Sequence, residues 1–384
     1  MTGAVDEERV ARAYLLRVAE PPAPSLVRFV EENGPVLAAA LVRAERCPAR
    51  VRDETVARKD QALAEHDLAE ASRLGARLVI PEDDEWPAWP LLSLEQASAR
   101  GLTGVSPPLG LWVRGDERLD EAADRAVSIV GARAATSYGE HVASEFAYEL
   151  AGRGVPIFSG AAYGIDGAAH RGALAADGTT VAVLGCGLDV GYPAGHVALL
   201  ERIAERGLVL TEYPPGTPPA RHRFLVRNRL IAALTEGTVV VEAGARSGAR
   251  NTACTAGALG KVVMAVPGPI GSAMSVGCHQ LIRDASATLV ASVADVAETV
   301  GRFGDGGAAG DEGPPKPRRP TDGLAKDALR VHEALGLRKG KSAEQVATES
   351  GIEVSKVRAI LPALEIDELA ERCDTGWRRR KEAR

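Results

Sequence analysis

Three features of the sequence predict an α/β fold built on a doubly wound, mostly parallel sheet. Between residues 126 and 300, short apolar runs of strand length alternate with helical patterns. The runs are apolar throughout, which is typical of parallel strands with both faces covered by helices. Glycine-containing turns follow most of these runs, and ligands of such sheets bind beyond the carboxyl ends of the strands. We therefore expect a Rossmann-like core, with a small helical domain before it and a winged-helix-like domain after it.

The composition is that of an ordinary globular chain, and it excludes several classes of protein. The 384 residues are 45% hydrophobic and 26% charged. No apolar run reaches the roughly 18 residues that a membrane span needs. The acidic start of the chain does not have the pattern of a secretory signal. The five cysteines stand far apart, so neither zinc nor a disulfide framework is expected, and a reducing cytoplasm fits them best.

The charge of the chain argues weakly against bulk affinity for nucleic acid. The formal net charge is −6, but a local basic groove is compatible with that value because the field depends on where the charges lie. Only eight of the 46 basic residues are lysines. The planar guanidinium of arginine suits phosphate binding and base stacking, so the positions of the arginines matter more than their number.

Residues 1–75 are expected to form a small helical domain without strands. Helical patterns cover residues 7–19, 25–33, 35–44 and 57–74. Ser25 is placed to cap the second of these helices. The domain could be a SAM-like or helix-hairpin-helix-like unit, although the glycine of a hairpin turn is missing. Its default role is packing or self-association.

The core domain, residues 76–300, opens with an irregular segment rich in tryptophan and proline. Two short strands are expected between residues 77 and 115. Asp83, Asp84 and Glu85 form a run of carboxylates in this segment, which could indicate a cation site. No further ligands stand at coordinating spacing, so a solvated turn is favoured and no metal is expected.

Regular alternation of strand and helix then follows. The predicted strands are residues 127–130, 155–158, 180–184, 208–211, 239–241, 262–266 and 288–290. Helical patterns between them include residues 141–151, 168–176 and 196–206. The spacing of the strands leaves room for a helical crossover after each one, as a parallel sheet requires.

The end of the chain is predicted to be a linker followed by a third domain. Residues 301–323 are glycine, proline and charge without a hydrophobic pattern, which indicates a flexible linker. Residues 324–384 are expected to form a winged-helix-like (DML1-like) domain. Its helical patterns cover residues 324–335, 342–350 and 354–364, and a short β-wing and a basic tail follow. Its role, in DNA or protein contact, is left open.

The stretch 155–174 is the centre of the predicted site. It runs from a short strand through the turn Ser159–Gly164 into a helix that carries Asp166 and His170. A strand that turns through glycines into a helix gathers backbone N–H groups where an anion can sit. The spacing matches neither GxGxxG nor the P-loop, so a plain turn without a ligand is the alternative.

One edge of the predicted sheet gathers glycine turns, arginines and an aromatic ring. These side chains are Arg133, Arg221, Phe224, Arg227 and Arg229. Arginines that neutralise phosphates, amides that bond them and a ring that stacks a base are what a single-strand-binding groove requires. The alternative for Arg227 and Arg229 is an ion pair with Glu212 or Glu242 that orients the loops.

An enzyme is the main alternative. Asp166 and His170 stand four residues apart, which permits an acid/base pair on one helix face. The sequence holds no Ser-His-Asp order, GxSxG elbow or HExxH motif, and Cys186 is interpreted as a small residue in a tight turn. A nucleoside-monophosphate phosphoribohydrolase would need a PGGxGTxxE-type loop where this chain has EAGARSGARNTA. A nucleotide-sensing regulator is a third hypothesis.

The ordered motifs of the core closely resemble those of the DNA-processing protein A family, also called DprA or Smf. They are VSIVGARAATSYG, FSGAAYGIDGAAHRGAL, VAVLGCGLDVGYP, TEYPPGTPP, F-x-x-RNR and AVPGP. The resemblance covers the whole α/β domain, and the plan of three domains agrees with it. It implies a cytoplasmic, non-enzymatic recombination mediator without a cofactor. Such a protein binds single-stranded DNA, forms dimers and helps to load the RecA recombinase during natural transformation.

The resemblance also implies the residues of a DNA-binding site. They are Gly131, Arg133, Ser159, Gly160, Gly164, Arg221, Phe224, Arg227, Asn228 and Arg229. Arg133 would contact phosphate and Phe224 would stack a base. Ser159, Gly160 and Gly164 would supply backbone contacts from the second loop.

Four positions depart from the family pattern. Leu225 stands where the family usually has proline, and His196 and His279 stand where it usually has asparagine. Arg250 lies in SGARNTA, where the family has SGSLITA, and could be an extra DNA contact or a surface charge. We expect these changes to affect fine geometry more than the fold.

Overall fold

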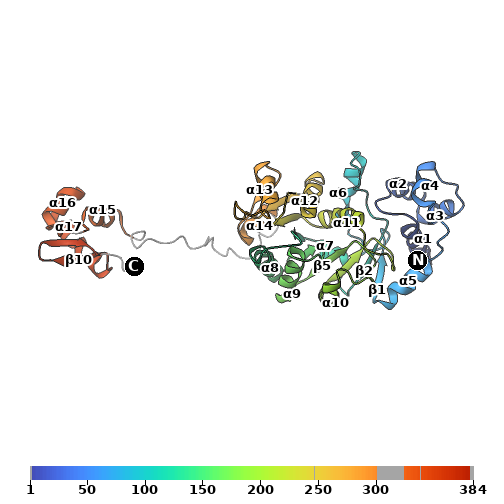
Figure 1. Ribbon diagram of the computed structural model, residues 1–384, viewed down its shortest axis with the longest axis horizontal. Coiled ribbons are helices and arrows are strands. Elements are labelled where there is room, and N and C mark those ends of the chain that lie inside the picture. Colours follow the sequence, from blue (N-terminus) through green and yellow to red (C-terminus); the bar gives the residue numbers. More distant parts are fainter. Residues whose placement is uncertain (1, 246, 301–323, 338, 381–384) are drawn as a thin grey trace. The chain divides into compact units, whose positions relative to one another are not determined.

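The structure is a computed structural model that describes residues 2–245, 247–300, 324–337 and 339–380. Residues 1–305 form one compact unit and residues 306–384 form another (Figure 1). The predicted linker, 301–323, and the last four residues of the basic tail lie outside the described residues. Among the described helices, none is long and apolar enough to cross a membrane.

A sheet of nine strands forms the core of the first unit, in the order β1-β2-β6-β5-β4-β3-β7-β8-β9. The strands are β1 (Ala76–Val79), β2 (Leu111–Arg114), β3 (Val127–Gly131), β4 (Ile157–Ser159), β5 (Thr180–Leu184), β6 (Leu208–Thr211), β7 (Gly237–Val241), β8 (Val262–Ala265) and β9 (Thr288–Leu289). β3 to β9 are parallel, whereas β1 and β2 are antiparallel additions at one edge. All seven predicted core strands are present, and the doubly wound, mostly parallel sheet is confirmed.

The direction of winding reverses beside β3. The chain moves outward from β3 through β4, β5 and β6, and β7 then returns to the other side of β3. β3 pairs with β7 along its full length, but it pairs with β4 only at Val127 and Ser128. A reversal of strand order leaves a crevice beyond the carboxyl ends of the strands. The fold therefore places a candidate site above β3, β4 and β7.

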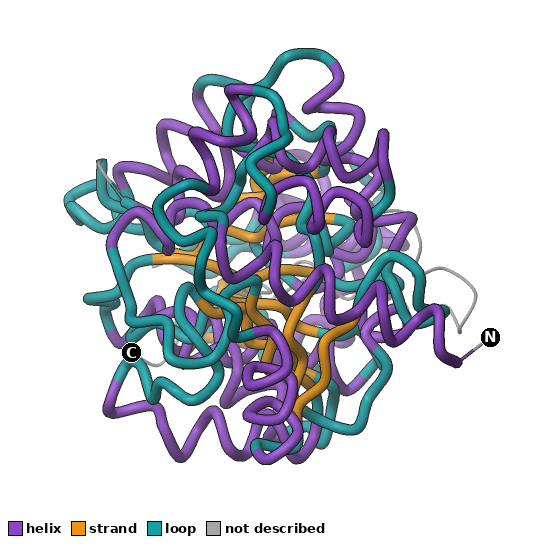
Figure 2. The backbone as a smooth tube through the Cα atoms, turned by 90° about the vertical axis from the view of Figure 1, so that its right-hand side faces the viewer, coloured by secondary structure: helices purple, strands orange, loops and turns teal. Residues whose placement is uncertain are grey.

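Helices cover both faces of this sheet (Figure 2). They are α6 (Ala88–Ala99), α7 (Leu119–Ala123), α8 (Ser137–Gly152), α9 (Ile165–Ala175), α10 (Val197–Arg206), α11 (Arg221–Ala233), α12 (Gly248–Ala258), α13 (Val276–Arg283) and α14 (Val293–Val300), with a short 3₁₀ turn at Ala194–His196. Val127 and Ile129 of β3 pack on the α8 and α9 side. Val130 packs on the opposite side, with α11 and α12. This alternation along one strand is why the buried strands are apolar throughout.

Five helices precede the sheet and pack on its antiparallel edge. They are α1 (Thr2–Val18), α2 (Pro24–Asn33), α3 (Pro35–Arg43), α4 (Ala49–Thr55) and α5 (Ala64–Arg73). Their apolar side chains share a cluster with Trp112 of β2, and the helices belong to the same compact unit as the sheet. The boundary at residue 75 and the SAM-like or helix-hairpin-helix-like assignment stay predictions.

Two local predictions for the first 75 residues were wrong, and two helices were not predicted. The helix expected at residues 57–74 starts only at Ala64, while α4 and α6 were not predicted. Ser25 does not cap α2, because Pro24 already occupies the first turn. The carboxylate of Glu54 in α4 accepts the Ser25 and Leu26 N–H groups instead, at 3.1 and 2.8 Å. The cap comes from another helix, which a local pattern does not reveal.

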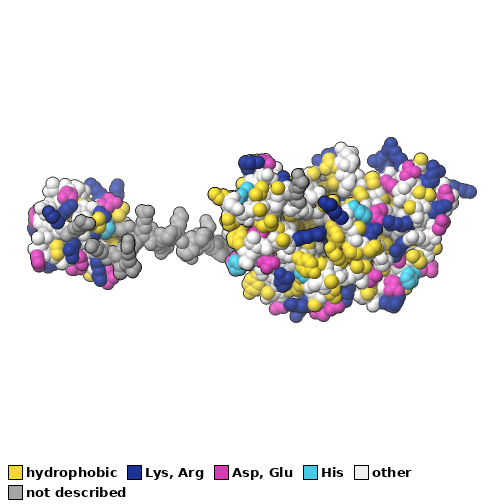
Figure 3. Space-filling view, in the orientation of Figure 1, with side chains coloured by type: hydrophobic (Ala, Val, Ile, Leu, Met, Phe, Trp, Pro, Cys, Tyr) yellow, Lys and Arg dark blue, Asp and Glu magenta, His cyan; other side chains and the backbone are white. Residues whose placement is uncertain are grey.

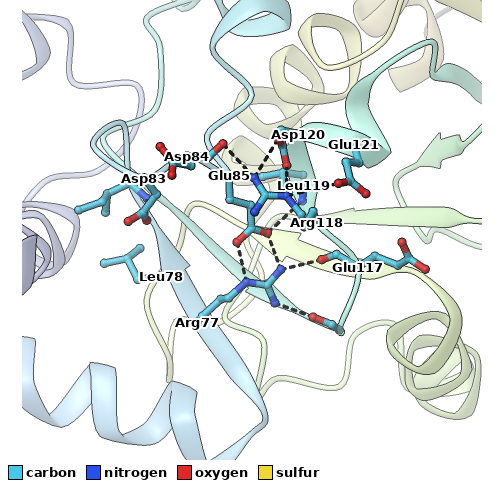
Figure 4. A network of polar contacts seen from close by, with 12 residues as sticks. Arg77, Leu78, Asp83, Asp84, Glu85, Glu117, Arg118, Leu119, Asp120 and Glu121 are labelled. Atoms are coloured by element: carbon cyan, nitrogen blue, oxygen red, sulfur yellow. Dashed lines mark hydrogen bonds and ion pairs between the residues drawn. The ribbon is translucent and has the colours of Figure 1, made fainter. Parts of the chain in front are cut away.

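The carboxylate run before Trp86 lies in a turn, as predicted, and Asp84 is exposed, but Asp83 and Glu85 are half-buried in ion pairs. Arg9 of α1 donates to both oxygens of Asp83, at 2.9 and 2.8 Å. Arg77 pairs with Glu85, and Glu85 also accepts the Leu119 N–H group at 2.9 Å (Figure 4). Among the described residues, no cluster of side chains suited to a metal occurs. Asp83 and Glu85 therefore join α1, β1 and α7.

The second unit is small and has its own apolar core. It contains α15 (Lys326–Ala334), α16 (Ala343–Ser350) and α17 (Val354–Ile366), followed by the antiparallel hairpin of β10 (Ala370–Cys373) and β11 (Gly376–Arg379). Ser342 and Gln345 form a capping box at the start of α16. The predicted helices and hairpin are present, whereas the assignment as a winged-helix-like domain stays a prediction.

Candidate nucleic-acid interface

A groove of about 820 Å³ lies beyond the carboxyl ends of the central strands. Its lining comes from the loop after β3, the loop after β4, the first two turns of α11 and the start of α12. The lining residues from the predicted site are Gly131, Arg133, Phe224, Arg227, Asn228 and Arg221. In Figure 3, Lys and Arg side chains lie beside a hydrophobic patch over this part of the first unit. Residues distant in the sequence therefore meet where the winding reverses.

The loop after β3 presents an exposed arginine on a fixed support. Glu242, which follows β7, accepts hydrogen bonds from the N–H and hydroxyl groups of Thr136 at 2.9 and 2.5 Å. Thr136 in turn caps α8 by accepting from the Gly139 N–H group at 3.2 Å. Arg133 is exposed, and no carboxylate of the described chain lies within ion-pair distance of it. Its charge is therefore available to a ligand in the groove.

The turn after β4 already holds a carboxyl group of its own. Oδ2 of Asp166 accepts from the Gly160 and Ala162 N–H groups, at 3.2 and 3.4 Å. The hydroxyl of Ser159 is fully buried and donates to the Ile129 carbonyl at 2.6 Å. Burial raises the pKa of Asp166, and the nearby Arg227 and the loop amides act in the opposite direction. The amides expected to bind an external phosphate are thus partly used inside the protein.

Gly164 serves a packing role in the same turn. Its φ is 72°, a left-handed conformation that favours glycine. A Cβ atom there would overlap the carbonyl oxygens of Ala132 and Arg133. Gly164 therefore lets the second loop pack against the first, and it lies behind the surface that Arg133 presents.

Phe224 is the central aromatic side chain of the groove. It is half-buried and stacks on Tyr192, with ring centroids 5.2 Å apart at 30°. The guanidinium of Arg133 lies 5.5 Å from its ring centroid and that of Arg227 lies 5.9 Å from it. Cation–π geometry of this kind is attractive. A preformed aromatic and cationic platform results.

Arg227 supports this platform from below. It is 5% exposed and donates to the carbonyls of Gly160, at 2.9 Å, and Val183. Burial lowers the pKa of Arg227 to about 10, so the side chain stays charged at neutral pH. A Cβ atom on Gly160 would lie 2.6 Å from the Arg227 guanidinium, so a side chain there would force the guanidinium to move. The glycine and the arginine form one packed unit.

Arg229 points away from the groove. Its Nη2 donates to both carboxylate oxygens of Glu212 at 2.8 Å, and the two side chains are 2% and 4% exposed. The ion pair that was the alternative interpretation of this residue is therefore present. Sequence reasoning had also placed Arg229 in the groove, but residues two positions apart on a helix, such as Arg227 and Arg229, lie on nearly opposite faces.

The remaining predicted residues lie on α11 and α12. Arg221 is exposed at the start of α11, and Asn228 donates to Asn251 Oδ1 at 3.1 Å. Arg250 is half-buried, and its Nη1 donates to the Ala245 carbonyl at 2.6 Å within its own loop. Leu225, in place of proline, lines the groove and is 48% exposed.

Histidines at the two departures hold loops. His196 Nδ1 lies 3.0 Å from the Ala161 carbonyl oxygen, and His279 Nε2 lies 2.9 Å from that of Gly268. His170 is fully buried and bonds Thr180 at 2.8 Å, and burial lowers its pKa to about 3. Burial likewise raises the pKa of Cys186 to about 11. Neither His170 nor Cys186 has the environment of a catalytic group.

Sequence reasoning missed three contributors to the groove. Tyr192 stacks on Phe224, Tyr163 lines the adjoining hollow, and Ser247 caps α12 where that helix begins at the rim. The signal for Tyr192 was present, because it follows the third core strand. Its contact with Phe224 could not be predicted, because the two rings come from segments that meet only in the folded protein.

The fold defines an α/β protein with an open groove at the switch point of its sheet. Similarity to known proteins gives the family. The sequence model described as DNA recombination-mediator protein A matches residues 77–301. A Mycobacterium tuberculosis (strain H37Rv) protein that bears the name DprA is 50% identical over 374 residues, which are 97% of this chain and 95% of that protein.

Two further relatives agree. Protein Smf of Escherichia coli (strain K12) is 42% identical over 190 residues, which cover 49% of this chain and 50% of that protein. The X-ray structure of DNA processing protein A (DprA) from Streptococcus pneumoniae is 30% identical, with a TM-score of 0.61 over 76% of this chain and 97% of that one. The chain therefore belongs to the DprA/Smf family of DNA-processing recombination mediators.

Proposed function

We propose that this protein binds single-stranded DNA along the groove above β3, β4 and β7. The observation that supports this most directly is the half-buried Phe224 ring, which lies within 6 Å of the guanidinium groups of Arg133 and Arg227 beside an open groove. A base would stack against the Phe224 platform while exposed arginines neutralise the neighbouring phosphates.

The proposed contacts divide by exposure. Arg133, Arg221 and Phe224 would contact the DNA strand, and Gly131 and Asn228 would line the groove along it. Gly160, Gly164 and Arg227 would keep the platform in place. Ser159 and Arg229 are bonded inside the protein, and Arg250 is bonded within its loop, so we give them supporting roles.

The partners and setting are proposed from the family. Membership of a recombination-mediator family supports loading of the RecA recombinase onto DNA in the cytoplasm, by a homodimer and without enzymatic turnover. Co-sedimentation with RecA and a measurement of mass in solution would test these two associations. Failure to bind RecA in the presence of single-stranded DNA would contradict the loading role.

Fluorescence anisotropy with labelled oligo-dT tests the DNA proposal. Binding should weaken steeply as salt increases, show little sequence preference and be weaker for duplex of equal length. Equal affinity for duplex would contradict it. Incubation with nucleoside monophosphates tests the enzyme alternative, and release of free base would favour a phosphoribohydrolase instead.

A further inference from the structure

The start of α11 carries an unusual concentration of positive charge. Arg221, His222 and Arg223 fill its first turn, which contains no acidic residue. The preceding residue, Ala220, makes no side-chain cap. The N-terminus of a helix carries partial positive charge, so cations there are unfavourable unless an anion lies close by.

Glu20, which follows α1, supplies that anion. Its Oε1 accepts from Arg223 Nε at 2.7 Å and lies 3.0 Å from His222 Nε2. Its Oε2 accepts from Arg223 Nη2 at 3.1 Å and from Arg58 Nη2 at 2.7 Å. Burial disfavours the charge, but these hydrogen bonds outweigh it and lower the pKa of Glu20 to about 2. One carboxylate therefore joins the N-terminal helices to the groove helix.

The loop that leads into α11 is held by the same helices. Arg17 of α1 pairs with Asp67 and donates to the Pro215 carbonyl at 2.8 Å. Arg223 donates to the Pro218 carbonyl at 2.5 Å, and its guanidinium lies 5.3 Å from the Tyr213 ring centroid. The loop is therefore anchored at several points between its strand and α11.

The residue after Arg223 is Phe224. A shift of the first turn of α11 would move the aromatic ring away from Tyr192 and Arg133, which are fixed by other loops. We propose that Glu20 is a positioning residue of the groove, through which the N-terminal helices set the orientation of Phe224. For its DNA readout this inference rests on the proposed function.

The variant Glu20→Gln tests the inference because two mechanisms predict opposite changes in the affinity for oligo-dT. If Glu20 were only a charge near the groove, its neutralisation would leave binding of the polyanion unchanged or strengthen it. As a positioning residue, its loss should weaken oligo-dT binding by about threefold to tenfold. Unchanged or tighter binding would overturn the inference.

Glu82→Gln is the matched control. Glu82 accepts two hydrogen bonds from Arg12 of α1, at 2.7 and 2.6 Å. Its substitution therefore removes an equivalent link between the same helix and the core. Glu82 does not line the groove. We expect both variants to lower thermal stability, but only Glu20→Gln to weaken binding. Equal loss of affinity in both would indicate a general effect of stability and overturn the inference.

Hydrogen exchange on the full chain without DNA separates this inference from the proposed function. Amides of α11 from Phe224 to Asn228 should exchange faster in Glu20→Gln than in wild type or Glu82→Gln. Exchange that is unchanged there would overturn the positioning role even if the protein binds DNA. Faster exchange in a protein that fails to bind oligo-dT would support the positioning role and contradict only the proposed ligand.

Discussion

Two loops leave the same edge of the sheet and use their polar groups in opposite ways. In the turn after β4 these groups are bonded inside the protein: Asp166 accepts hydrogen bonds from two backbone amides, and the Ser159 hydroxyl donates to a carbonyl of β3. The loop after β3 is closed only at its base, where Glu242 holds Thr136, and it leaves Arg133 exposed. A glycine-rich turn therefore does not reveal whether its donors are free.

The residues in and around α11 divide in the same way, into those bonded inside the protein and those that face the groove. We call Gly160, Arg227 and Arg229 the inner set, because their contacts lie inside the protein. Arg133, Arg221 and Phe224 form the outer set, which faces the groove. Changes in the inner set should lower stability, whereas changes in the outer set should lower binding alone.

Arg229→Ala should have the largest effect. It leaves the buried Glu212 carboxylate without its partner, and loss of one member of a buried pair costs about 3–5 kcal/mol of unfolding free energy. Urea denaturation measures this. The double variant Glu212→Gln/Arg229→Met removes both charges and should recover part of the loss. If Arg229→Ala keeps full stability but loses DNA binding, Arg229 belongs to the outer set.

Gly160→Ala should be the next most severe change. The added methyl group would lie 2.6 Å from the Arg227 guanidinium, which is bonded to two carbonyls and cannot move freely. We expect a loss of about 1–3 kcal/mol in urea denaturation, typical of overpacking. Gly152→Ala, at a position with open space beside it, is the control. Equal stability of the two variants would show that the Arg227 site tolerates the methyl group.

Arg133→Ala tests the outer set. Its stability should change by less than about 0.5 kcal/mol, as for surface positions in general. Affinity for oligo-dT should fall about fivefold, with a shallower salt dependence because one phosphate contact is lost. Arg153→Ala, an exposed arginine at the far end of α8, should keep wild-type affinity. Similar losses in both would mean that overall charge, and not the groove, sets affinity.

The last prediction concerns the pH dependence of stability. The pKa of Glu20 falls from about 4.5 to about 2 on folding, so its stabilisation is present above about pH 4.5 and disappears as pH falls toward 2. With allowance for solvent screening, Glu20→Gln should cost about 1–2 kcal/mol at pH 7. The difference from wild type should shrink steadily in urea denaturation below pH 4.5. A constant difference across that range would contradict the assigned pKa.

The sequence predicted the parts of this molecule that depend on local pattern. The seven core strands, their parallel order and the motifs at their carboxyl ends follow from apolar runs and glycine turns. The sequence also brought Arg133, Phe224 and Arg227 to one edge, where the structure places them.

Contacts between distant segments could not be predicted. Glu54 caps α2 from another helix, and Glu20 meets α11 across some two hundred residues of chain. The direction of Arg229 depends on where Glu212 lies after folding, which the RNR motif does not encode. Spacing along a chain shows which residues share an element, but the partner of a buried charge is set by the assembled core.

The short pairing between β3 and β4 has a mechanical consequence. β3 pairs with β7 over its whole length but with β4 at only two positions. The sheet therefore has a weakly paired line between β3 and β4, here called the seam, beneath the groove. The Ser159 hydroxyl bonds Ile129 across this seam in place of a ladder hydrogen bond. Slow opening of the native protein should begin along this line, with β3 and β7 remaining together. Single-stranded DNA bound above the seam would contact both sides of it and raise the free energy of that opening.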